Sequence, residues 1–164
     1  MAEVLDEAME TAEDTQKGKF LTFSVGRESY GIEIKFVTEI IGIQDITEVP
    51  ELPNYVRGII NLRGKIIPVI DVRLRFKKEL KKYNDRTCIV VIDIKETYVG
   101  LIVDNVAEVI KIDDSNIVPP PDIKTGFHNR YVRAIGKVGN EIKLLLDCDK
   151  LLNDDEMEIL NTII

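Results

Sequence analysis

The chain of 164 residues carries one sequence pattern twice. The first copy, residues 20–71, contains the strings YGIEIKFVTEI, YVRGI and PVIDV, and the second copy, residues 87–147, contains YVGLIVDNVAEVI, YVRAI and LLLDC in the same order. A Val-Pro pair lies between the first and second string of each copy. A duplication this regular indicates two copies of one small module. The seam between two such modules is a candidate ligand site.

The spacing between the copies changes at one place. The offset from Tyr55 to Tyr131 is larger than the offset from Val49 to Val118. The second copy therefore contains about seven additional residues, and they fall after Pro119 in the stretch PPDIKTGFHNR. We interpret this stretch as a loop inserted into the second module.

Short runs rich in β-branched residues alternate with turn signals in both copies, and each copy contains about five such runs. Short, evenly spaced strands are typical of small barrels rather than βαβ units, and closure into a barrel removes the exposed edges of an open sheet. We therefore predict an all-β fold with two five-stranded barrels, the first over residues 18–85 or so and the second over about 86–148.

The two ends of the chain differ from the repeats. Residues 1–16 carry six acidic and no basic side chains, so we interpret residues 1–17 as an acidic flexible tail. Near the C-terminus, Asn153 and Glu156 have the spacing of a capping box, and Met157, Leu160 and Ile164 follow at helical intervals. This pattern predicts a short helix over about 150–163 that packs on a barrel.

Net charge and hydropathy argue against several functions. The formal net charge is −7, but the tail supplies six of these charges, so the folded body is nearly neutral. This argues against a nucleic-acid binder, which needs a basic face. No apolar run is long enough to span a bilayer or to form a signal peptide, so we expect a cytoplasmic protein without membrane insertion. The cysteines, Cys88 and Cys148, lie in apolar runs and fit buried thiols.

Residues 73–86 form a basic stretch with seven basic and two acidic side chains. A nucleic-acid or membrane role is conceivable for such a stretch. We favour a solvated connector, because the stretch falls where the repeat requires a linker between the modules.

No arrangement for catalysis, cofactor binding or metal binding is found. His128 is the single histidine, and a catalytic triad or a zinc site needs more ligands at fixed spacings. Gly64 precedes no helix, so its segment predicts a hairpin turn rather than a phosphate loop. Four aspartates at predicted strand ends are interpreted as solvated or turn-capping carboxylates: Asp71, Asp93, Asp104 and Asp147.

One charged pair stands out among the apolar strands. Arg63 follows an apolar strand, where a long cation is usually exposed or paired, and Glu39 in the stretch VTEII is its natural partner. The two residues predict a partly buried structural ion pair. They also fit a polar site for a partner at the seam between the two modules, and both interpretations stay open from sequence alone.

The run RGIINLRGKIIPVIDVR, together with YGIEIKFVTEI, GLIVDNVAEV and the ending LLLDCDKLLNDDEM, resembles the CheW family of bacterial chemotaxis coupling proteins. The resemblance covers about residues 18–160. It implies two SH3-like five-stranded barrels and an adaptor without catalysis or cofactor. It also implies that the adaptor joins the cytoplasmic tips of methyl-accepting chemoreceptors to the histidine kinase CheA at receptor arrays.

The resemblance further implies which residues meet each partner. The receptor would bind a groove between the barrels that is lined by nine positions: Val37, Glu39, Gly58, Arg63, Thr87, Cys88, Ile89, Gly100 and Ala134. The barrel ends would meet the regulatory domain of CheA. Ala134 departs from the family, which often has glycine there, and its methyl group would narrow a close backbone approach.

Gly100 is the sharpest candidate in this groove, because a glycine within a strand often marks the close approach of another backbone. We expect Gly100→Val to leave the chain folded and to weaken receptor binding. A single-stranded nucleic-acid-binding protein is the alternative function, since small five-stranded barrels often bind such strands. The nearly neutral body and the aromatic content of 6% count against it.

Overall fold

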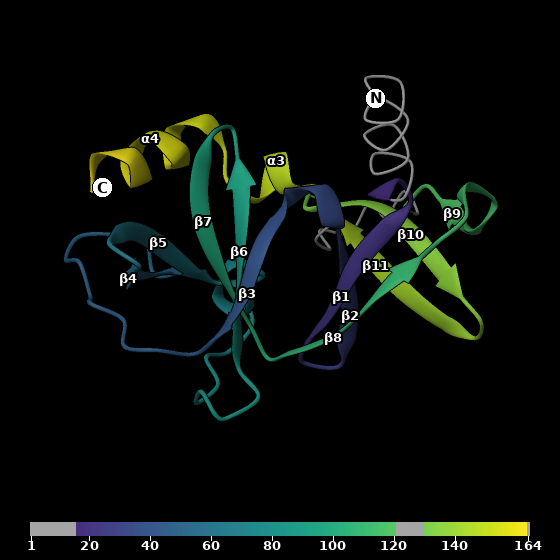
Figure 1. Cartoon of the computed structure of the whole chain (residues 1–164), viewed down its shortest axis with the longest axis horizontal. Coiled ribbons are helices and arrows are strands. Elements are labelled where there is room, and N and C mark those ends of the chain that lie inside the picture. Colours follow the sequence, from purple (N-terminus) through teal and green to yellow (C-terminus); the bar gives the residue numbers. More distant parts are fainter. Residues whose placement is uncertain (1–15, 121–129, 164) are drawn as a thin grey trace, which may run out of the picture.

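The computed structural model describes residues 16–120 and 130–163, which form two β-sheets and several short helices (Figure 1). Sheet A has the strand order β8 (Asn105–Lys111), β1 (Lys19–Val25), β2 (Glu28–Glu33), β11 (Glu141–Leu146), β10 (Val132–Val138) and β9 (Ile117–Val118). Sheet B has the order β3 (Val37–Gly42), β6 (Cys88–Ile94), β7 (Thr97–Val103), β5 (Lys65–Asp71) and β4 (Val56–Leu62).

The two copies of the repeat exchange their first hairpins. Hairpin β1–β2 of the first copy lies in sheet A with β8, β10 and β11 of the second copy, and hairpin β6–β7 of the second copy lies in sheet B with β3, β4 and β5 of the first. The predicted boundary at residues 85–86 is therefore wrong as a division between the sheets. Sequence reasoning assumed that each copy closes on itself, whereas a reciprocal exchange pairs the same strand edges.

Two parallel strand pairs join the exchanged pieces. Strand β5 pairs with β7 at Val69 and Gly100, and β11 pairs with β2 at Leu145 and Gly31. Beyond β3, Thr47 exchanges two backbone hydrogen bonds of 2.9 Å with Ile59 of β4, which links the two outer strands of sheet B. The predicted all-β class with two SH3-like subdomains is confirmed.

Three apolar cores hold the sheets together. The largest, here called the central core, lies between the sheets and includes Phe23 and Ile32 of sheet A and Val90 and Leu101 of sheet B. Core B lies on the other face of sheet B and includes Ile60, Ile67, Val69, Ile89, Val91 and Ile102. Core A includes Phe20, Ile112, Ala134 and Leu145. The seam is therefore filled with apolar side chains, each stabilising the fold by roughly 1.5–3 kcal/mol.

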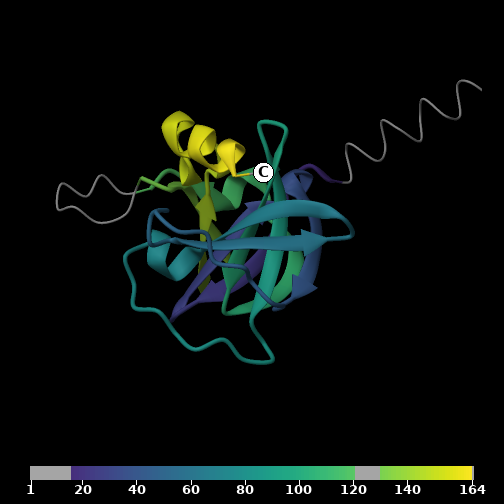
Figure 2. The same cartoon turned by 90° about the vertical axis from the view of Figure 1, so that its left-hand side faces the viewer.

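Short helices close the ends of both copies. Helix α2 (Val72–Arg75) follows β5 and α3 (Cys148–Leu151) follows β11, and each begins after an aspartate, Asp71 or Asp147, whose side chain accepts hydrogen bonds from the first turn. Helix α4 (Asp154–Thr162) has the predicted capping box between Asn153 and Glu156. It lies at the upper left of both views (Figures 1 and 2). The acidic tail over residues 1–15 and most of the inserted loop lie outside the described residues.

An arginine at the start of the basic connector ties α4 to both repeats. The guanidinium of Arg75 lies 4.4 Å from the ring centre of Tyr55 and 5.0 Å from that of Tyr131, the equivalent residue in the second copy. It also donates to Glu156 at 2.7 Å and to the carbonyl of Leu151 at 2.8 Å. The Arg75 side chain is 9% exposed. This arrangement fixes the end of the chain on the central core.

The expectation of a solvated connector is wrong for the first residues of the stretch 73–86. Arg73 makes two short hydrogen bonds to the carboxylate of Asp104, at 2.5 and 2.7 Å, and Lys78 pairs with Glu28 at 2.9 Å. Asp104 also accepts from the backbone N–H of Gly26. The connector therefore fastens the β1–β2 turn to the end of β7.

Candidate functional site

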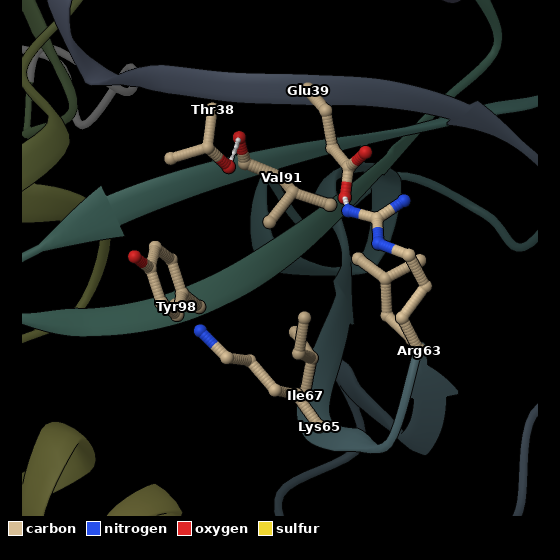
Figure 3. Close-up of a pocket in the computed structure, with 8 residues that line it drawn as sticks. Thr38, Glu39, Arg63, Lys65, Ile67, Val91 and Tyr98 are labelled. Atoms are coloured by element: carbon tan, nitrogen blue, oxygen red, sulfur yellow. Dashed lines mark hydrogen bonds and ion pairs between the residues drawn. The ribbon is translucent and has the colours of Figure 1, made fainter.

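A pocket of about 280 Å³ opens at one end of core B (Figure 3). Its walls come from strands β3, β6 and β7 and from the β4–β5 hairpin, and it is lined by Thr38, Glu39, Leu62, Arg63, Lys65, Ile67, Val91 and Tyr98. The ammonium group of Lys65 lies 4.8 Å from the ring centre of Tyr98. The pocket thus combines an apolar floor with charged and aromatic walls.

The structure brings the predicted pair Glu39 and Arg63 together across this pocket. The guanidinium donates to the carboxylate at 2.5 Å, and the two side chains point toward each other in Figure 3. The Glu39 side chain is 26% exposed, but that of Arg63 is 72% exposed, so the expected partial burial holds for Glu39 and is wrong for Arg63, which water reaches. Because Glu39 lies opposite Val91 of core B, the pair is on the face of sheet B turned away from the seam.

A second candidate surface follows the rim of the seam. Val37 of β3 and Cys88 of β6 are partly buried and pack against the central core. Val106 of β8 packs there in the same way. Strands β3 and β8 occupy equivalent positions in sheets B and A, so they contribute to the rim from the two sides of the seam.

Two larger apolar side chains complete this rim. Ile40 is 43% exposed and lies opposite Val90, while Val109 is 49% exposed and lies opposite Leu21. Both Val90 and Leu21 belong to the central core, and residues that face each other across paired strands share a face of the sheet. We name the set Val37, Ile40, Cys88, Val106 and Val109 the seam rim.

Sequence reasoning missed three residues of the seam rim, although the repeat contains the signal. Val106 is the repeat equivalent of Val37, and Val109 is that of Ile40, at the same offset that relates the two Val-Pro pairs. The exposure of Ile40 depends on its place on an edge strand, which the strand pattern alone does not determine.

Gly100 and Ile89 do not line a surface. Both are buried, and a Cβ atom built on Gly100 would lie 2.7 Å from Cγ1 of Val69 and 2.8 Å from Cγ2 of Ile89. The glycine therefore admits neighbouring side chains of core B rather than a partner's backbone. This packing argues against the expectation that Gly100→Val leaves the fold intact, because the added atoms would overlap these side chains.

Three further predicted groove residues are also buried. Gly58 has φ +145°, and a Cβ atom there would lie 2.1 Å from the carbonyl oxygen of Thr47. Ala134, its equivalent in the second copy, packs in core A. Thr87 is 5% exposed and its hydroxyl accepts from the backbone N–H of Asn84, which shapes the end of the connector. All three hold the fold and offer little surface to a partner.

The titratable groups with shifted pKa values serve the fold. Burial raises the pKa of Glu156, but hydrogen bonds from Asn153, Tyr55 and Arg75 outweigh it, so the pKa lies below its usual value. Burial raises the pKa of the Cys148 thiol to about 12, which keeps it protonated.

Among residues 16–120 and 130–163, no three His, Cys, Asp or Glu side chains gather in an arrangement that could hold a metal ion. Within the same ranges no helix has the length and apolarity needed to cross a membrane.

Known proteins resemble this chain along nearly its whole length. A sequence model of the CheW-like domain matches residues 19–156. The chemotaxis protein CheW of Klebsiella aerogenes is 33% identical over 152 residues, which cover 93% of this chain and 92% of that protein. CheW of Treponema pallidum is 32% identical over 151 residues, covering 90% and 89%. Protein FrzA of Myxococcus xanthus is 27% identical over 136 residues, covering 82% and 84%.

A solved structure has a similar fold and sequence. The scaffolding protein TtCheW of Thermoanaerobacter tengcongensis superposes with a TM-score of 0.78 at 37% sequence identity. The match covers 85% of this chain and 94% of that chain. Sequence and fold similarity therefore extend over both subdomains.

Proposed function

The chain belongs to the CheW-like family of chemotaxis adaptors, and we propose that it joins chemoreceptors to the regulatory domain of the histidine kinase CheA through separate surfaces. It acts as a scaffold and not as an enzyme. The observation that carries this function is the match of the CheW-like domain to residues 19–156, which takes in both sheets and the start of α4.

The receptor surface of this proposal is the seam rim. Ile40 and Val109 expose apolar side chains on edge strands of the two sheets, with Val37, Cys88 and Val106 partly buried beside them. An amphipathic helix binds such a strip by placing apolar anchors at helical spacing into it. The cytoplasmic tip of a chemoreceptor presents helices of this kind, and the rim offers apolar contacts from both sheets.

Glu39 and Arg63 flank this surface in the proposal. Glu39 is the neighbour of Ile40 on β3 but points to the opposite face, toward the pocket of core B. A helix that lies along the edge of β3 would therefore meet apolar side chains on one face and the Glu39–Arg63 pair on the other. Charged groups at such a border contribute to partner selection more than to affinity.

The kinase surface of the proposal consists of the ends of the two sheets. Ile66 at the β4–β5 hairpin is 43% exposed, and Ile142, its equivalent in β11, is 60% exposed. Exposed apolar side chains at the ends of a small barrel suit a domain of similar shape. Repetition of the feature at both ends supports contacts with the kinase regulatory domain at either end.

Two matched substitutions test the receptor surface. Ile40→Glu places a charge on the seam rim, and we expect it to weaken binding of a receptor fragment at least about tenfold, since a buried unpaired charge is costly. Ile159→Glu on α4 is the control, because Ile159 is 42% exposed and lies away from the rim. Titration calorimetry with the receptor fragment and with the CheA regulatory domain measures both affinities.

We expect only the Ile40→Glu variant to lose affinity, and only for the receptor fragment. The seam rim would not be the receptor site if both variants lost the same affinity for the receptor fragment. The same conclusion would follow if Ile40→Glu weakened the binding of both partners. A titration of single-stranded DNA at low salt tests the nucleic-acid alternative, which no comparison supports. A fluorescent fusion of the chain tests the proposed location in the cytoplasm at receptor arrays.

A further inference from the structure

A second pocket, of about 420 Å³, opens at the end of core A near the start of the described chain. Its apolar floor includes Phe20, a member of core A, and Ile117, which packs against that core. The complete lining is Gln16, Lys17, Gly18, Lys19, Phe20, Glu33, Lys35, Asp114, Ile117 and Arg133. Four of these side chains are basic and two are acidic, so the pocket carries an excess of positive charge.

The acidic side chains of the pocket leave part of this charge unbalanced. Glu33 contacts two cations, since its carboxylate lies 3.2 Å from Lys35 and also accepts from Arg133. Lys17 and Lys19 make no ion pair with any residue in the described part of the chain. Two lysines beside an apolar floor form a surface that suits an acidic segment with some apolar residues.

Such a segment is attached to the pocket itself. Gln16 lines the pocket, and residues 1–15 directly before it carry six acidic side chains and no basic one. An extended chain spans at most about 3.3–3.6 Å per residue, so Glu10, Glu13 and Asp14 lie well within reach of Lys17 and Lys19. We propose that residues 1–15 of this chain bind in the basic pocket at the end of core A.

The tail then competes with any other acidic segment for this pocket. A tethered segment acts at an effective concentration of about millimolar, so even weak intrinsic affinity occupies the site in part. The pocket lies at one end of sheet A, and on the proposed function the kinase regulatory domain approaches such ends.

A peptide titration tests the proposal without receptor or kinase, so its outcome is independent of the proposed function. The probe is a fluorescent synthetic peptide of residues 1–15, and its anisotropy reports binding to full-length protein. One variant neutralises the tail by Glu10→Gln, Glu13→Gln and Asp14→Asn. A second variant adds Lys17→Gln and Lys19→Gln to it. A control adds Lys81→Gln and Lys82→Gln instead, which removes the same charge from two exposed lysines that do not line the pocket.

Release of the pocket from its own tail should make the tail-neutral chain bind the peptide about tenfold more tightly than the native chain. The variant with Lys17→Gln and Lys19→Gln should lose this increase in affinity, and the control variant should keep it. High salt should abolish the increase, because salt screens the attraction between charges. Circular dichroism checks that each variant is folded. Equal affinity of native and tail-neutral chains, absence of binding to both, or equal loss in the pocket variant and the control would overturn the proposal.

Discussion

Apart from β9, sheets A and B have the same strand order when each strand is replaced by its equivalent in the other copy of the repeat. The order β3-β6-β7-β5-β4 of sheet B corresponds to β8-β1-β2-β11-β10 of sheet A, and both contain one parallel pair at the same place in the order. The sheets differ in their surfaces. The backbone arrangement is therefore duplicated, whereas the surface side chains of the two copies have diverged.

The β4 and β10 strands show one such difference. Gly58 has φ +145° because the carbonyl of Thr47 lies where its side chain would be, whereas Ala134 carries a methyl group that packs in core A. The loop after β3 crosses close to β4 through the Thr47–Ile59 bridge, and the loop after β8 instead forms β9 beside β10. The path of one loop thus decides which copy requires glycine.

Charge shows a second difference. Glu39 pairs with Arg63 in sheet B, but the equivalent positions in sheet A are Glu108 and Gly139, so the repeat retains the acid without its partner. Lys65 likewise corresponds to Glu141. Two ends of similar shape that differ in charge can select different partners or different faces of one partner.

The largest expected effect is a difference in the free energy of unfolding between substitutions at Gly58 and at Ala134. Gly58→Ala forces a methyl group against the Thr47 carbonyl at a φ that only glycine adopts readily, and we expect a loss of about 3 kcal/mol in the free energy of unfolding. Ala134→Gly should cost about 1 kcal/mol, since it removes one methyl group and loosens the strand. Urea denaturation measures both, and equal losses would show that the two strands are under the same constraint.

The second prediction contrasts two arginines. Arg75→Ala leaves the partly buried carboxylate of Glu156 without its cation and frees α4, so we expect a loss of about 3 kcal/mol in the free energy of unfolding. Arg63→Ala should cost only about 0–1 kcal/mol, because the Arg63 side chain is 72% exposed. Thermal denaturation of both variants checks the order, and a larger loss for Arg63→Ala would contradict it.

The third prediction concerns the equivalent glycines of the parallel pairs. A Cβ atom on Gly100 would crowd Val69 and Ile89, whereas one on Gly31 would come within 2.8 Å of only the flexible end of Leu145. We expect Gly100→Ala to cost about 1–3 kcal/mol by overpacking and Gly31→Ala to cost less. Urea midpoints measured side by side decide the order, and a reversed order would show that core A is the tighter of the two.

The smallest expected effect is a change with pH. The pKa of Glu156 in the folded chain lies below its unfolded value of about 4.3. The ionised Glu156 therefore contributes fully to the free energy of unfolding above the unfolded pKa. This contribution is lost as the pH falls through the folded pKa. Arg75→Ala removes one cause of the lowered pKa. The free energy of unfolding of the Arg75→Ala variant should therefore fall less between neutral pH and pH 4 than that of the native chain. A steeper fall in the variant would show that Arg75 does not lower the pKa of Glu156.

The sequence predicted the strands, the terminal capping box and the Glu39–Arg63 pair, because each depends on local pattern or on an obvious charge partner. It did not predict the exchange of hairpins between the sheets. Both the exchanged and the consecutive arrangement satisfy the same repeat and the same alternation of apolar residues, and only long-range pairing separates them.

The groove residues divide for a related reason. Val37 and Cys88 lie at the seam rim, but Ile89 and Gly100 face core B because the face of a strand follows from its pairing register. A bulge between Val37 and Glu39 places these two residues on opposite faces of sheet B, and sequence alternation alone would place them on one.

The claim of two separate partner surfaces is tested most directly by simultaneous binding. A receptor fragment and the CheA regulatory domain are each labelled with a different dye and sedimented with this chain, alone and together. Separate surfaces predict one species that contains both dyes and the chain, and predict that a saturating amount of one partner leaves the affinity for the other unchanged. Displacement of one partner by the other would show that they share a surface and would contradict the account.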